Sequence, residues 1–437
     1  MTLRLTVLGT GYLGATHAAA MTELGHDVLG MDVDADKIAR LSAGEVPFFE
    51  PGLEPLLRKG LESGRLRFTT SCDEVVEFGD VHFVCVGTPQ RPDSYAADIR
   101  YIDAVSATLF PLLKRACLVV GKSTVPAGTA DRLADDLARL APDAELAWNP
   151  EFLREGYAVE DTLRPDRLVF GVRPGGRGEA VLRDVYKGVI GPETPVVVTD
   201  YATAELVKVA ANAFLATKIS FINAMAEVCE ATGADVKRLS EALSHDARIG
   251  GRFLHAGLGF GGGCLPKDIR AFMSRAEELG VEQALSFLRE VDAINLRRRA
   301  RMVDLARELV GGGFEGRRVG VLGAAFKPNT DDIRDSPALD VASAILAEGA
   351  YVTVYDPAAM AAARERYPQL EYSDTAIEAV RDADVVLHLT EWAEFRDMDP
   401  SVLDDVVRER RIVDGRNALD PELWRAAGWT YRALGRP

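Results

Sequence analysis

The sequence predicts an α/β protein in which two doubly wound parallel sheets are joined by a central helical region. Three observations predict this fold class: a glycine turn between an apolar strand and a helix at the start, a long helical pattern in the middle, and a second series of apolar strands after residue 316. At 437 residues the chain has room for roughly three domains of ~150 residues. We predict domains at 1–200, 201–300 and 301–437.

The bulk composition is typical of a globular protein, with 47% hydrophobic and 27% charged residues. Lys+Arg 51 against Asp+Glu 67 gives a net charge of −16 without a long basic block, which argues against a nucleic-acid partner. An anionic small-molecule substrate is compatible with this net charge if basic residues gather at its binding site. No uninterrupted apolar run reaches the ~18 residues of a membrane span, so we expect no membrane association.

The cysteines favour a reducing compartment. The five of them form no Cys-x-x-Cys pair and no metal-ligand spacing with histidine, so we expect free thiols and no metal. The N-terminus enters a strand almost at once, which argues against a signal peptide and predicts a cytoplasmic protein.

The first segment carries a dinucleotide-binding pattern. A strand over 5–8 leads into Gly9-Thr10-Gly11-Tyr12-Leu13-Gly14, a helix over 15–24, and a strand over 27–31 that ends at Asp32. The glycines permit a tight turn, and the helix N-terminus receives a pyrophosphate. Asp32 is placed to accept hydrogen bonds from ribose hydroxyls and would repel a 2′-phosphate. The segment therefore predicts a Rossmann-like domain that binds NAD rather than NADP.

Polar loops follow the next two predicted strands, 81–86 and 117–120. They contain Thr88 and Thr124, and ligands of open α/β sheets bind at these strand ends. Further on, Asn149-Pro150 resembles a helix start, which would place Glu151 and Glu155 on one helical face. Ordinary turns and favourable charge at a helix N-terminus would explain the same residues.

Over 201–232 the spacing of the apolar residues changes to that of a helix. Helices are also predicted over 234–242 and 268–279. Lys208 and Asn212 are one turn apart in this region, where a lysine and an amide can stabilise a developing oxyanion. A solvated helix face is the alternative interpretation.

The run Gly259-Phe260-Gly261-Gly262-Gly263-Cys264-Leu265-Pro266-Lys267-Asp268 is the most informative in the chain. Pro266 suits the first turn of a helix, with Cys264 just ahead of it. A cysteine at a helix N-terminus beside a cation loses its proton more easily than a free thiol, which predicts a nucleophile. A buried, inert cysteine in a glycine-rich turn is the alternative.

A second α/β unit begins at 317–323, and its strands over 351–355, 384–389 and 411–413 echo the first domain. Its glycine turn, Gly323 to Pro328, is not a dinucleotide fingerprint, so a different ligand is expected. Lys327, Arg334 and Arg416 lie near its strand ends and fit a pyrophosphate; surface ion pairs are the alternative.

Taken together, these segments resemble the UDP-glucose/GDP-mannose dehydrogenase family nearly end to end. The resemblance rests on Gly9 to Gly14, Glu50-Pro51-Gly52-Leu53, Gly87-Thr88-Pro89, Lys122-Ser123-Thr124-Val125-Pro126, Asn149 to Gly156, Ala204 to Asn223, Gly259 to Asp268 and Phe326 to Pro337. It implies a four-electron oxidation of a nucleotide-sugar C6 alcohol to a carboxylate with two NAD, through a thiohemiacetal and a thioester on Cys264.

The resemblance also implies residue roles. Lys208 and Asn212 would stabilise oxyanions, Asp268 and Thr124 would position water and protons, and Glu151 would assist thioester hydrolysis. Cofactor contacts carry over, with the glycine turn, to Gly9, Gly11, Tyr12, Leu13, Gly14, Asp32, Lys37, Thr88, Thr124, Glu155 and Arg334. Substrate contacts carry over to Phe152, Leu153, Lys208, Asn212, Arg248, Phe260, Gly261 and Lys327. Arg248 matches a residue that reaches a neighbouring subunit's site in relatives, which implies a homodimer or a larger assembly.

Two departures and several alternatives accompany this interpretation. Gly263 replaces a serine or tyrosine, which would loosen the cysteine loop, and 91–97 diverges from the family's loop. UDP-glucose is the expected substrate; GDP-mannose or a UDP-N-acetylhexosamine is the alternative. An inactive nucleotide-sugar-binding regulator and a simple β-hydroxyacid dehydrogenase explain fewer of these residues, since neither needs Cys264. No tyrosine is followed four residues later by lysine, which argues against a short-chain dehydrogenase.

Overall fold

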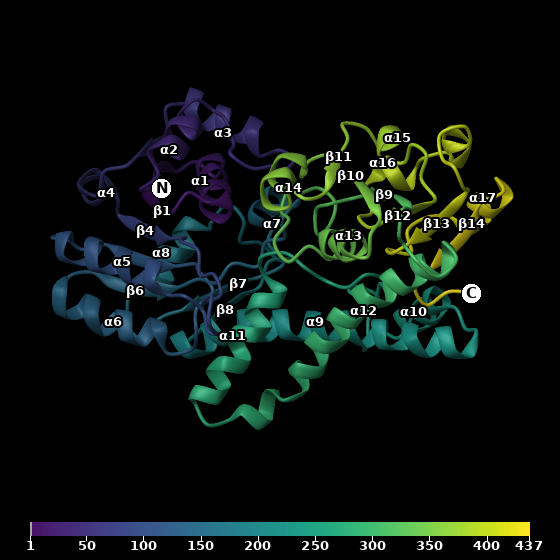
Figure 1. Cartoon of the computed structure of the whole chain (residues 1–437). Helices are drawn as coiled ribbons and strands as arrows, with labels where there is room; N and C mark the ends of the chain where they lie inside the picture. The colour runs from purple at the N-terminus through teal and green to yellow at the C-terminus, as the bar shows by residue number, and fades with distance from the viewer. Residues whose placement is uncertain (1) are drawn as a thin grey trace. The chain divides into compact units, whose positions relative to one another are not determined.

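The computed structural model describes residues 2–437, which form two compact units (Figure 1). Unit 1 comprises residues 1–211 and 270–280, and unit 2 comprises residues 212–269 and 281–437. One boundary falls within helix α9 (Tyr201–Thr232), one within helix α11 (Leu265–Glu278), and one after α11, between residues 280 and 281. Each unit contains its own sheet, so the predicted α/β class with two doubly wound sheets is confirmed.

The sheet of unit 1 has the strand order β3-β2-β1-β4-β5-β6-β7-β8, and in the described chain its one antiparallel pair is β6 with β7. The strands are β1 (Arg4–Leu8), β2 (Asp27–Met31), β3 (Leu66–Thr69), β4 (Val81–Val84), β5 (Leu118–Gly121), β6 (Glu145–Trp148), β7 (Leu168–Gly171) and β8 (Val196–Thr199). The helices are α1 (Tyr12–Glu23), α2 (Ala35–Ser42), α3 (Leu53–Glu62), α4 (Cys72–Phe78), α5 (Arg100–Leu109), α6 (Thr129–Leu140), α7 (Ala158–Leu163) and α8 (Gly178–Val185).

Helices cover both faces of this sheet because its strands are apolar on both sides. Leu5 and Val7 of β1 pack with α1, α3 and α8 in one buried cluster, whereas Leu8 packs with α4, α5 and α6 in the other. This double covering is typical of parallel sheets. It leaves the C-terminal strand ends, where the predicted site residues lie, as the edge at which ligands bind.

Unit 2 contains a parallel sheet with the order β11-β10-β9-β12-β13-β14. The strands are β9 (Arg318–Leu322), β10 (Tyr351–Tyr355), β11 (Glu371–Tyr372), β12 (Val385–His388), β13 (Arg411–Asp414) and β14 (Thr430–Ala433). Unit 2 also contains parts of α9 and α11. Its other helices are α10 (Val236–Ser244), α12 (Phe287–Leu309), α13 (Pro337–Ala347), α14 (Met360–Arg366), α15 (Ala376–Ala379), α16 (Ala393–Arg396) and α17 (Pro421–Ala426).

The helices predicted over 15–24, 201–232, 234–242 and 268–279 are present, and their ends differ from the prediction by at most three residues. The helix expected from residue 15 begins at Tyr12, because Gly11 already serves as its N-cap. The one expected from residue 268 begins at Leu265, with Pro266 in its first turn as predicted. The central helix expected over 201–232 is α9.

Helix α9 is unusually long and apolar. Across residues 2–437 it is the one helix whose length and mean hydropathy would suffice to cross a membrane, although core helices of soluble proteins meet the same criterion. Charged residues interrupt it, among them Lys208 and Lys218, and 44% of its most apolar window is buried in the protein.

Candidate active site

The glycine turn of unit 1 fits an anionic diphosphate. A Cβ at Gly14 would lie 1.8 Å from the Gly9 carbonyl oxygen, so glycine is required for α1 to begin this close to the turn. Among residues 2–437, no side chain caps the N-terminus of α1, and a Cβ at Gly11 would meet nothing within 4 Å. Free N–H groups that face open space at a helix N-terminus are what a pyrophosphate binds.

Asp32 follows β2 and is held as an oriented carboxylate. Its Oδ2 accepts hydrogen bonds from the Thr10 N–H (2.9 Å) and from Lys37 Nζ (2.9 Å), while its Oδ1 accepts one from the Asp34 N–H (3.1 Å). Burial alone would raise the pKa of Asp32, but the bonds from Lys37 and the backbone lower it below its ordinary value. The carboxylate therefore stays ionised at neutral pH, as a ribose contact requires.

Replacing Asp32 with alanine is expected to weaken NAD binding by roughly 10- to 100-fold, because hydrogen bonds to a charged group are worth about 1.5–3 kcal/mol. Fluorescence titration with NADH measures the change in Kd. Asp34→Ala is the matched control: it removes the N-cap of α2, whose side chain accepts from the Lys37 N–H, but should leave the affinity near that of the wild type. Undiminished affinity in Asp32→Ala would refute the ribose contact.

The two predicted strand-end loops of unit 1 lie together. The Thr88 hydroxyl, after β4, donates to the Thr124 carbonyl (2.7 Å), and the Ser123 hydroxyl, after β5, donates to the Val86 carbonyl (2.7 Å). The adjacent pairing of β4 with β5 brings these loops to one edge. Thr88 and Thr124 are thus neighbours, as expected for residues that share a ligand.

The helix predicted to begin at Asn149-Pro150 is wrong, because α7 begins only at Ala158. The Asn149 side chain is buried: its Nδ2 donates to the Val169 carbonyl (3.0 Å), and its Oδ1 accepts from the Tyr186 hydroxyl (2.6 Å). It is therefore unavailable as a cap. Glu151 and Glu155 lie in irregular backbone and do not share a helical face.

Glu155 lies in a segment that Glu50 holds in place. The Glu50 carboxylate accepts from the N–H groups of Gly156 (2.6 Å) and Ala158 (2.7 Å), and the Tyr12 hydroxyl also accepts from Gly156 (2.8 Å). Glu155 itself is 9% exposed. The Glu50-Pro51-Gly52-Leu53 motif therefore fixes this segment against the start of α1.

Phe152 carries two cations on its ring. The guanidinium of Arg167 lies 3.9 Å from the ring centroid, and Lys208 Nζ lies 5.6 Å from it. The cation–π contact holds the lysine of α9 beside the segment that contains Glu151, whose pKa it also helps to lower. Lys208, Phe152 and Glu151 thus form one group in unit 1, and Leu153 follows directly on it.

Unit 2 presents the cysteine at the start of a helix. Cys264 is exposed and directly precedes α11, whereas Cys85, Cys117 and Cys229 are buried and Cys72 is partly buried. The alternative that Cys264 is buried in its glycine-rich turn is therefore wrong. All five cysteines lie in the described part of the chain and are free thiols.

The glycine loop ahead of Cys264 is tightly held rather than loosened by Gly263. A Cβ at Gly263 would lie 2.2 Å from the guanidinium carbon of Arg334, so that guanidinium occupies the space of the missing side chain. The Gly262 N–H donates to the Arg334 carbonyl (2.8 Å), and Asp332 pairs with the guanidinium (2.7 Å). The predicted loosening of this loop is thus not what the structure shows.

Asp268 and Asn212 meet inside unit 2. Asn212 Nδ2 donates to Asp268 Oδ2 (2.6 Å), and Lys267 pairs with the other carboxylate oxygen. Both Asn212 and Asp268 are buried, with exposed fractions of 7% and 2%. Two residues predicted to act on the same reaction therefore contact each other directly.

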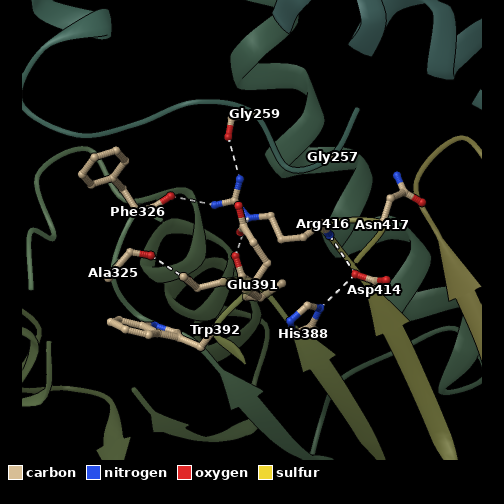
Figure 2. A network of polar contacts seen from close by, with 12 residues as sticks. Gly257, Gly259, Ala325, Phe326, His388, Glu391, Trp392, Asp414, Arg416 and Asn417 are labelled. Carbon is tan, nitrogen blue, oxygen red and sulfur yellow. Dashed lines mark hydrogen bonds and ion pairs between the residues drawn. The ribbon is translucent and has the colours of Figure 1, made fainter. Parts of the chain in front are cut away.

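Arg416 has a different role from the expected one, as Figure 2 shows. Its guanidinium donates to the carbonyls of Leu389 (2.7 Å), Gly259 (2.9 Å) and Phe326 (2.9 Å), and it pairs with Glu391 (3.3 Å). Burial lowers its pKa. The prediction that Arg416 awaits a pyrophosphate is wrong, because its donors join the cysteine loop to loops that follow β9 and β12.

The other predicted residues of unit 2 are spread over its loops. Phe260 is 6% exposed, and its backbone exchanges two hydrogen bonds with the Asn295 side chain (2.8 and 2.9 Å). Lys327 Nζ lies 5.4 Å from the Phe326 ring centroid. Arg248 points into solvent, with 89% of its side chain exposed, and pairs with Asp246 (2.7 Å).

Sequence reasoning missed the residues that support these loops. Asn295 and Arg299 on α12 both contact the Phe260 backbone, and Lys122 after β5 contacts Glu151. Polar residues on a charged helix resemble a surface, so no pattern distinguishes Asn295 or Arg299. A lysine directly after a buried strand was the available signal for Lys122.

The described chain offers no candidate metal centre: within residues 2–437, no group of three or more His, Cys, Asp or Glu side chains is arranged to hold an ion.

Comparison with known proteins matches this arrangement over nearly the whole chain. The family models for the UDP-glucose/GDP-mannose dehydrogenase family match at residues 3–190 (NAD binding domain), 202–297 (central domain) and 320–421 (UDP binding domain). A UDP-glucose 6-dehydrogenase of Pseudomonas aeruginosa is 41% identical over 100% of this chain and 98% of its own.

Solved structures agree. A UDP-glucose dehydrogenase from the archaeon Pyrobaculum islandicum matches with a TM-score of 0.90 and 40% identity, covering 100% of this chain and 98% of that one. A UDP-D-ManNAc dehydrogenase from Pyrococcus horikoshii matches with a TM-score of 0.85 and 27% identity, covering 99% of each chain. With a dinucleotide-binding turn in unit 1 and an exposed cysteine in unit 2, the chain is an NAD-dependent oxidoreductase that belongs to the UDP-glucose/GDP-mannose dehydrogenase family.

Proposed function

We propose that the chain oxidises the C6 alcohol of UDP-glucose to the carboxylate of UDP-glucuronate. The full-length relative and the structural neighbour at 40–41% identity both carry UDP-glucose in their names, whereas the UDP-D-ManNAc enzyme stands at 27%. The UDP binding domain model matches the strands and loops of unit 2. A uridine diphosphate sugar is therefore the favoured substrate class.

The single observation that carries the chemistry is the environment of Cys264. It is exposed at the start of a 14-residue helix, while burial raises the pKa of the thiols of Cys72, Cys85, Cys117 and Cys229. A helix N-terminus stabilises a thiolate, and the thiolate is the nucleophile. Covalent capture by such a cysteine permits two successive oxidations without release of an aldehyde.

The two oxidations need a hydride acceptor, which two successive NAD molecules bound by the domain at residues 3–190 would supply. The C6 alcohol first loses its hydroxyl proton to solvent and its hydride to the acceptor, which leaves an aldehyde. The Cys264 thiolate adds to the carbonyl carbon of this aldehyde and gives the oxyanion of a thiohemiacetal. Loss of the second hydride gives a thioester. Water then attacks the thioester carbonyl, the carbon–sulfur bond breaks, and Cys264 leaves as the thiolate while the product carries the carboxylate.

The resemblance to the family assigns roles in these steps to individual residues. Lys208 and Asn212 stabilise the negative oxygens, for which a cation and an amide donor are suited. Asp268 and Thr124 position water and protons, and Glu151 takes a proton from the attacking water. Cofactor contacts are proposed for the glycine turn and for Asp32, Lys37, Thr88, Thr124, Glu155 and Arg334, and substrate contacts for Phe152, Leu153, Lys208, Asn212, Arg248, Phe260, Gly261 and Lys327.

A substrate comparison tests the proposed identity. NADH formation is measured with UDP-glucose, GDP-mannose and UDP-N-acetylglucosamine at matched concentrations. The proposal predicts the highest kcat/KM with UDP-glucose. A preference for another sugar would keep the chemistry and correct the substrate, and silence with all three would support a binding-only role instead.

We also propose that the chain forms a homodimer through α9. Phe214, Phe221 and Val228 are spaced seven residues apart, so they lie on one helix face, and their exposed fractions are 67%, 48% and 52%. Aromatic side chains in a row on an exposed helix face favour pairing with a second copy. The exposure of Arg248 is compatible with its proposed contact to a neighbouring subunit.

Phe214→Glu/Phe221→Glu is expected to convert the dimer into monomers, because it places four carboxylates in the paired interface. Light scattering coupled to size exclusion measures the mass, which should fall from two chains to one. Val402→Glu is the control, since Val402 is comparably exposed (49%) but lies outside α9. An unchanged mass in the double variant would contradict the proposed interface.

Five free thiols support a reducing compartment, so we propose a cytoplasmic location. Fractionation of the native host, with detection by antibody, tests this directly, and recovery with the membrane or extracellular fraction would contradict it.

A further inference from the structure

Lys122 is a buried lysine that forms an ion pair with a candidate catalytic residue, Glu151. It directly follows β5, and its side chain is 3% exposed. Its Nζ pairs with Glu151 Oε2 (2.9 Å) and donates to Asn149 Oδ1 (3.1 Å) and the Tyr186 hydroxyl (3.3 Å). Burying an ammonium group is costly unless it is paired, so this arrangement calls for an explanation.

Glu151 is fixed at both carboxylate oxygens. Oε2 faces Lys122, and Oε1 accepts the N–H groups of Phe152 (2.8 Å) and Leu153 (3.0 Å). The backbone bonds hold the carboxylate plane, while the lysine supplies the charge. Removing the lysine would leave a largely buried carboxylate with only two neutral donors.

The electrostatics of the pair follow from this geometry. Burial alone would raise the pKa of Glu151, but the charge and the hydrogen bond of Lys122 lower it below its ordinary value. Burial alone would lower the pKa of Lys122, but the attraction of Glu151 raises it. Each partner therefore keeps the other ionised.

We propose that Lys122 is the positioning residue that keeps Glu151 ionised and oriented, and that it thereby sets the lowest pH at which the thioester is hydrolysed. This inference rests on the proposed role of Glu151, which accepts a proton from the attacking water. A protonated Glu151 has no vacant site for that proton, so hydrolysis fails once Glu151 is neutral.

The other titratable groups around the pair do not provide this switch. His17 on α1 has a pKa lowered well below its ordinary value by burial and by the Lys122 charge, so it stays neutral. Burial raises the pKa of Cys85, after β4, to about 12, and that of Tyr186, after α8, to about 12. Lys208, on α9, contributes positive charge that acts in the same direction as Lys122.

The experiment follows the decay of the Cys264 thioester. Enzyme is mixed with UDP-glucose and NAD, quenched at intervals, and the covalent adduct is quantified by intact-protein mass spectrometry between about pH 5 and 9. Four variants are compared with the wild type: Lys122→Met, Glu151→Gln, the double variant, and Tyr186→Phe. Tyr186→Phe is the matched control, because it removes a hydroxyl from the same cluster but leaves the charge.

The wild type should hydrolyse the thioester at a rate that does not fall between about pH 8 and pH 5, since the pKa of Glu151 lies below its usual ~4.3. In Lys122→Met the acid limb should move up by about two pH units, to near pH 6, because burial is no longer opposed by the lysine charge; hydrolysis should then fall about ten-fold at pH 5, and alkali should restore it. Glu151→Gln should hydrolyse the thioester slowly at every pH. The double variant should hydrolyse it at the same rate as Glu151→Gln, and no more slowly. Tyr186→Phe should resemble the wild type.

Two outcomes would overturn the inference in distinguishable ways. Wild-type hydrolysis in Glu151→Gln would refute the proposed role of Glu151, and with it the role of Lys122. Slow hydrolysis in Glu151→Gln together with an unshifted acid limb in Lys122→Met would refute the role of Lys122 alone. If Lys122→Met does not fold, the pH dependence of thioester hydrolysis by the wild type tests the inference instead. A wild-type rate that falls on the acid side with a midpoint near about pH 6 would contradict it.

Discussion

Replacing Cys264 with alanine is expected to lower the production of UDP-glucuronate by roughly 10⁴-fold or more, the order seen when a catalytic nucleophile is removed. The methyl group cannot add to the aldehyde, so neither the thiohemiacetal nor the thioester forms. NAD binding should stay near that of the wild type, because Cys264 is not among the residues proposed to contact the cofactor. Coupled assay of the acid product and NADH titration measure both quantities.

Cys72→Ala is the control for this prediction. Burial and the neighbouring Asp73 raise the pKa of the Cys72 thiol, so it should be neither a nucleophile nor readily alkylated at neutral pH. A stoichiometric alkylating reagent should accordingly modify Cys264 first and abolish activity. Unchanged acid production by Cys264→Ala, or inactivation that follows labelling of Cys72 instead, would contradict the thioester route.

The second large effect concerns stability. Asp414, at the end of β13, is fully buried, and its carboxylate accepts hydrogen bonds from the Arg416 N–H (2.9 Å), the Leu419 N–H (2.8 Å) and the Tyr431 hydroxyl (3.0 Å). His388 Nδ1 lies 2.9 Å from it, as Figure 2 shows. Asp414→Ala leaves all these buried groups without their hydrogen-bond acceptor, and each buried polar group left unsatisfied costs about 1–3 kcal/mol.

The melting temperature of Asp414→Ala should therefore fall by roughly 10 °C, as differential scanning calorimetry measures. Burial alone would raise the pKa of Asp414, but the bonds from His388 and the backbone lower it. A lowered folded-state pKa contributes stability that is complete above the unfolded value and is lost as the pH falls through the folded one. The gap between the two proteins should therefore be constant from about pH 6 to 8 and shrink only below about pH 4.

A matched variant separates this network from general damage to the sheet. Asp384→Ala removes another buried aspartate of unit 2, whose carboxylate accepts from the Arg318 N–H (2.8 Å) but pairs with arginines that are about half exposed. The melting temperature of Asp384→Ala should fall less than that of Asp414→Ala, because solvent screens the ion pairs of Asp384 with these arginines. Equal falls in melting temperature in the two variants would contradict the prediction that Asp414 stabilises unit 2 more than Asp384 does.

The dinucleotide turn and the cysteine loop were predictable because their chemistry is local. A glycine turn between β1 and α1, and Pro266 in the first turn of α11, follow from backbone requirements that a few adjacent residues express. The paired strands β1 and β4 were likewise readable, since each is an unbroken apolar run.

The predictions that proved wrong share one cause: residues far away in the sequence determine the local structure. Asn149 has the residue type of a helix cap, but Tyr186 and Val169 occupy its amide. Arg416 resembles a phosphate-binding cation, yet carbonyls from three separate loops occupy its guanidinium. Gly263 suggested a loose loop, and Arg334, 71 residues later in the chain, fills the space. Long-range contacts of this kind leave no periodic signal in one sequence.

Six strands were also missed: β3, β6, β7, β8, β11 and β14. Among them, β11 is two residues long, too short for alternation or an apolar run to identify it. β8 is a short valine run, Val196–Thr199, at the edge of its sheet. Their pairing with β10 and β7 is what establishes them as strands.

The measurement that tests the central claim most directly is the stoichiometry of a complete reaction. A limiting, known amount of UDP-glucose is consumed in excess NAD, and NADH and UDP-glucuronate are both quantified at the end. Two NADH and one acid per UDP-glucose, without free aldehyde during turnover, is the predicted result. One NADH per sugar, or an aldehyde that accumulates in solution, would contradict a four-electron oxidation carried by Cys264.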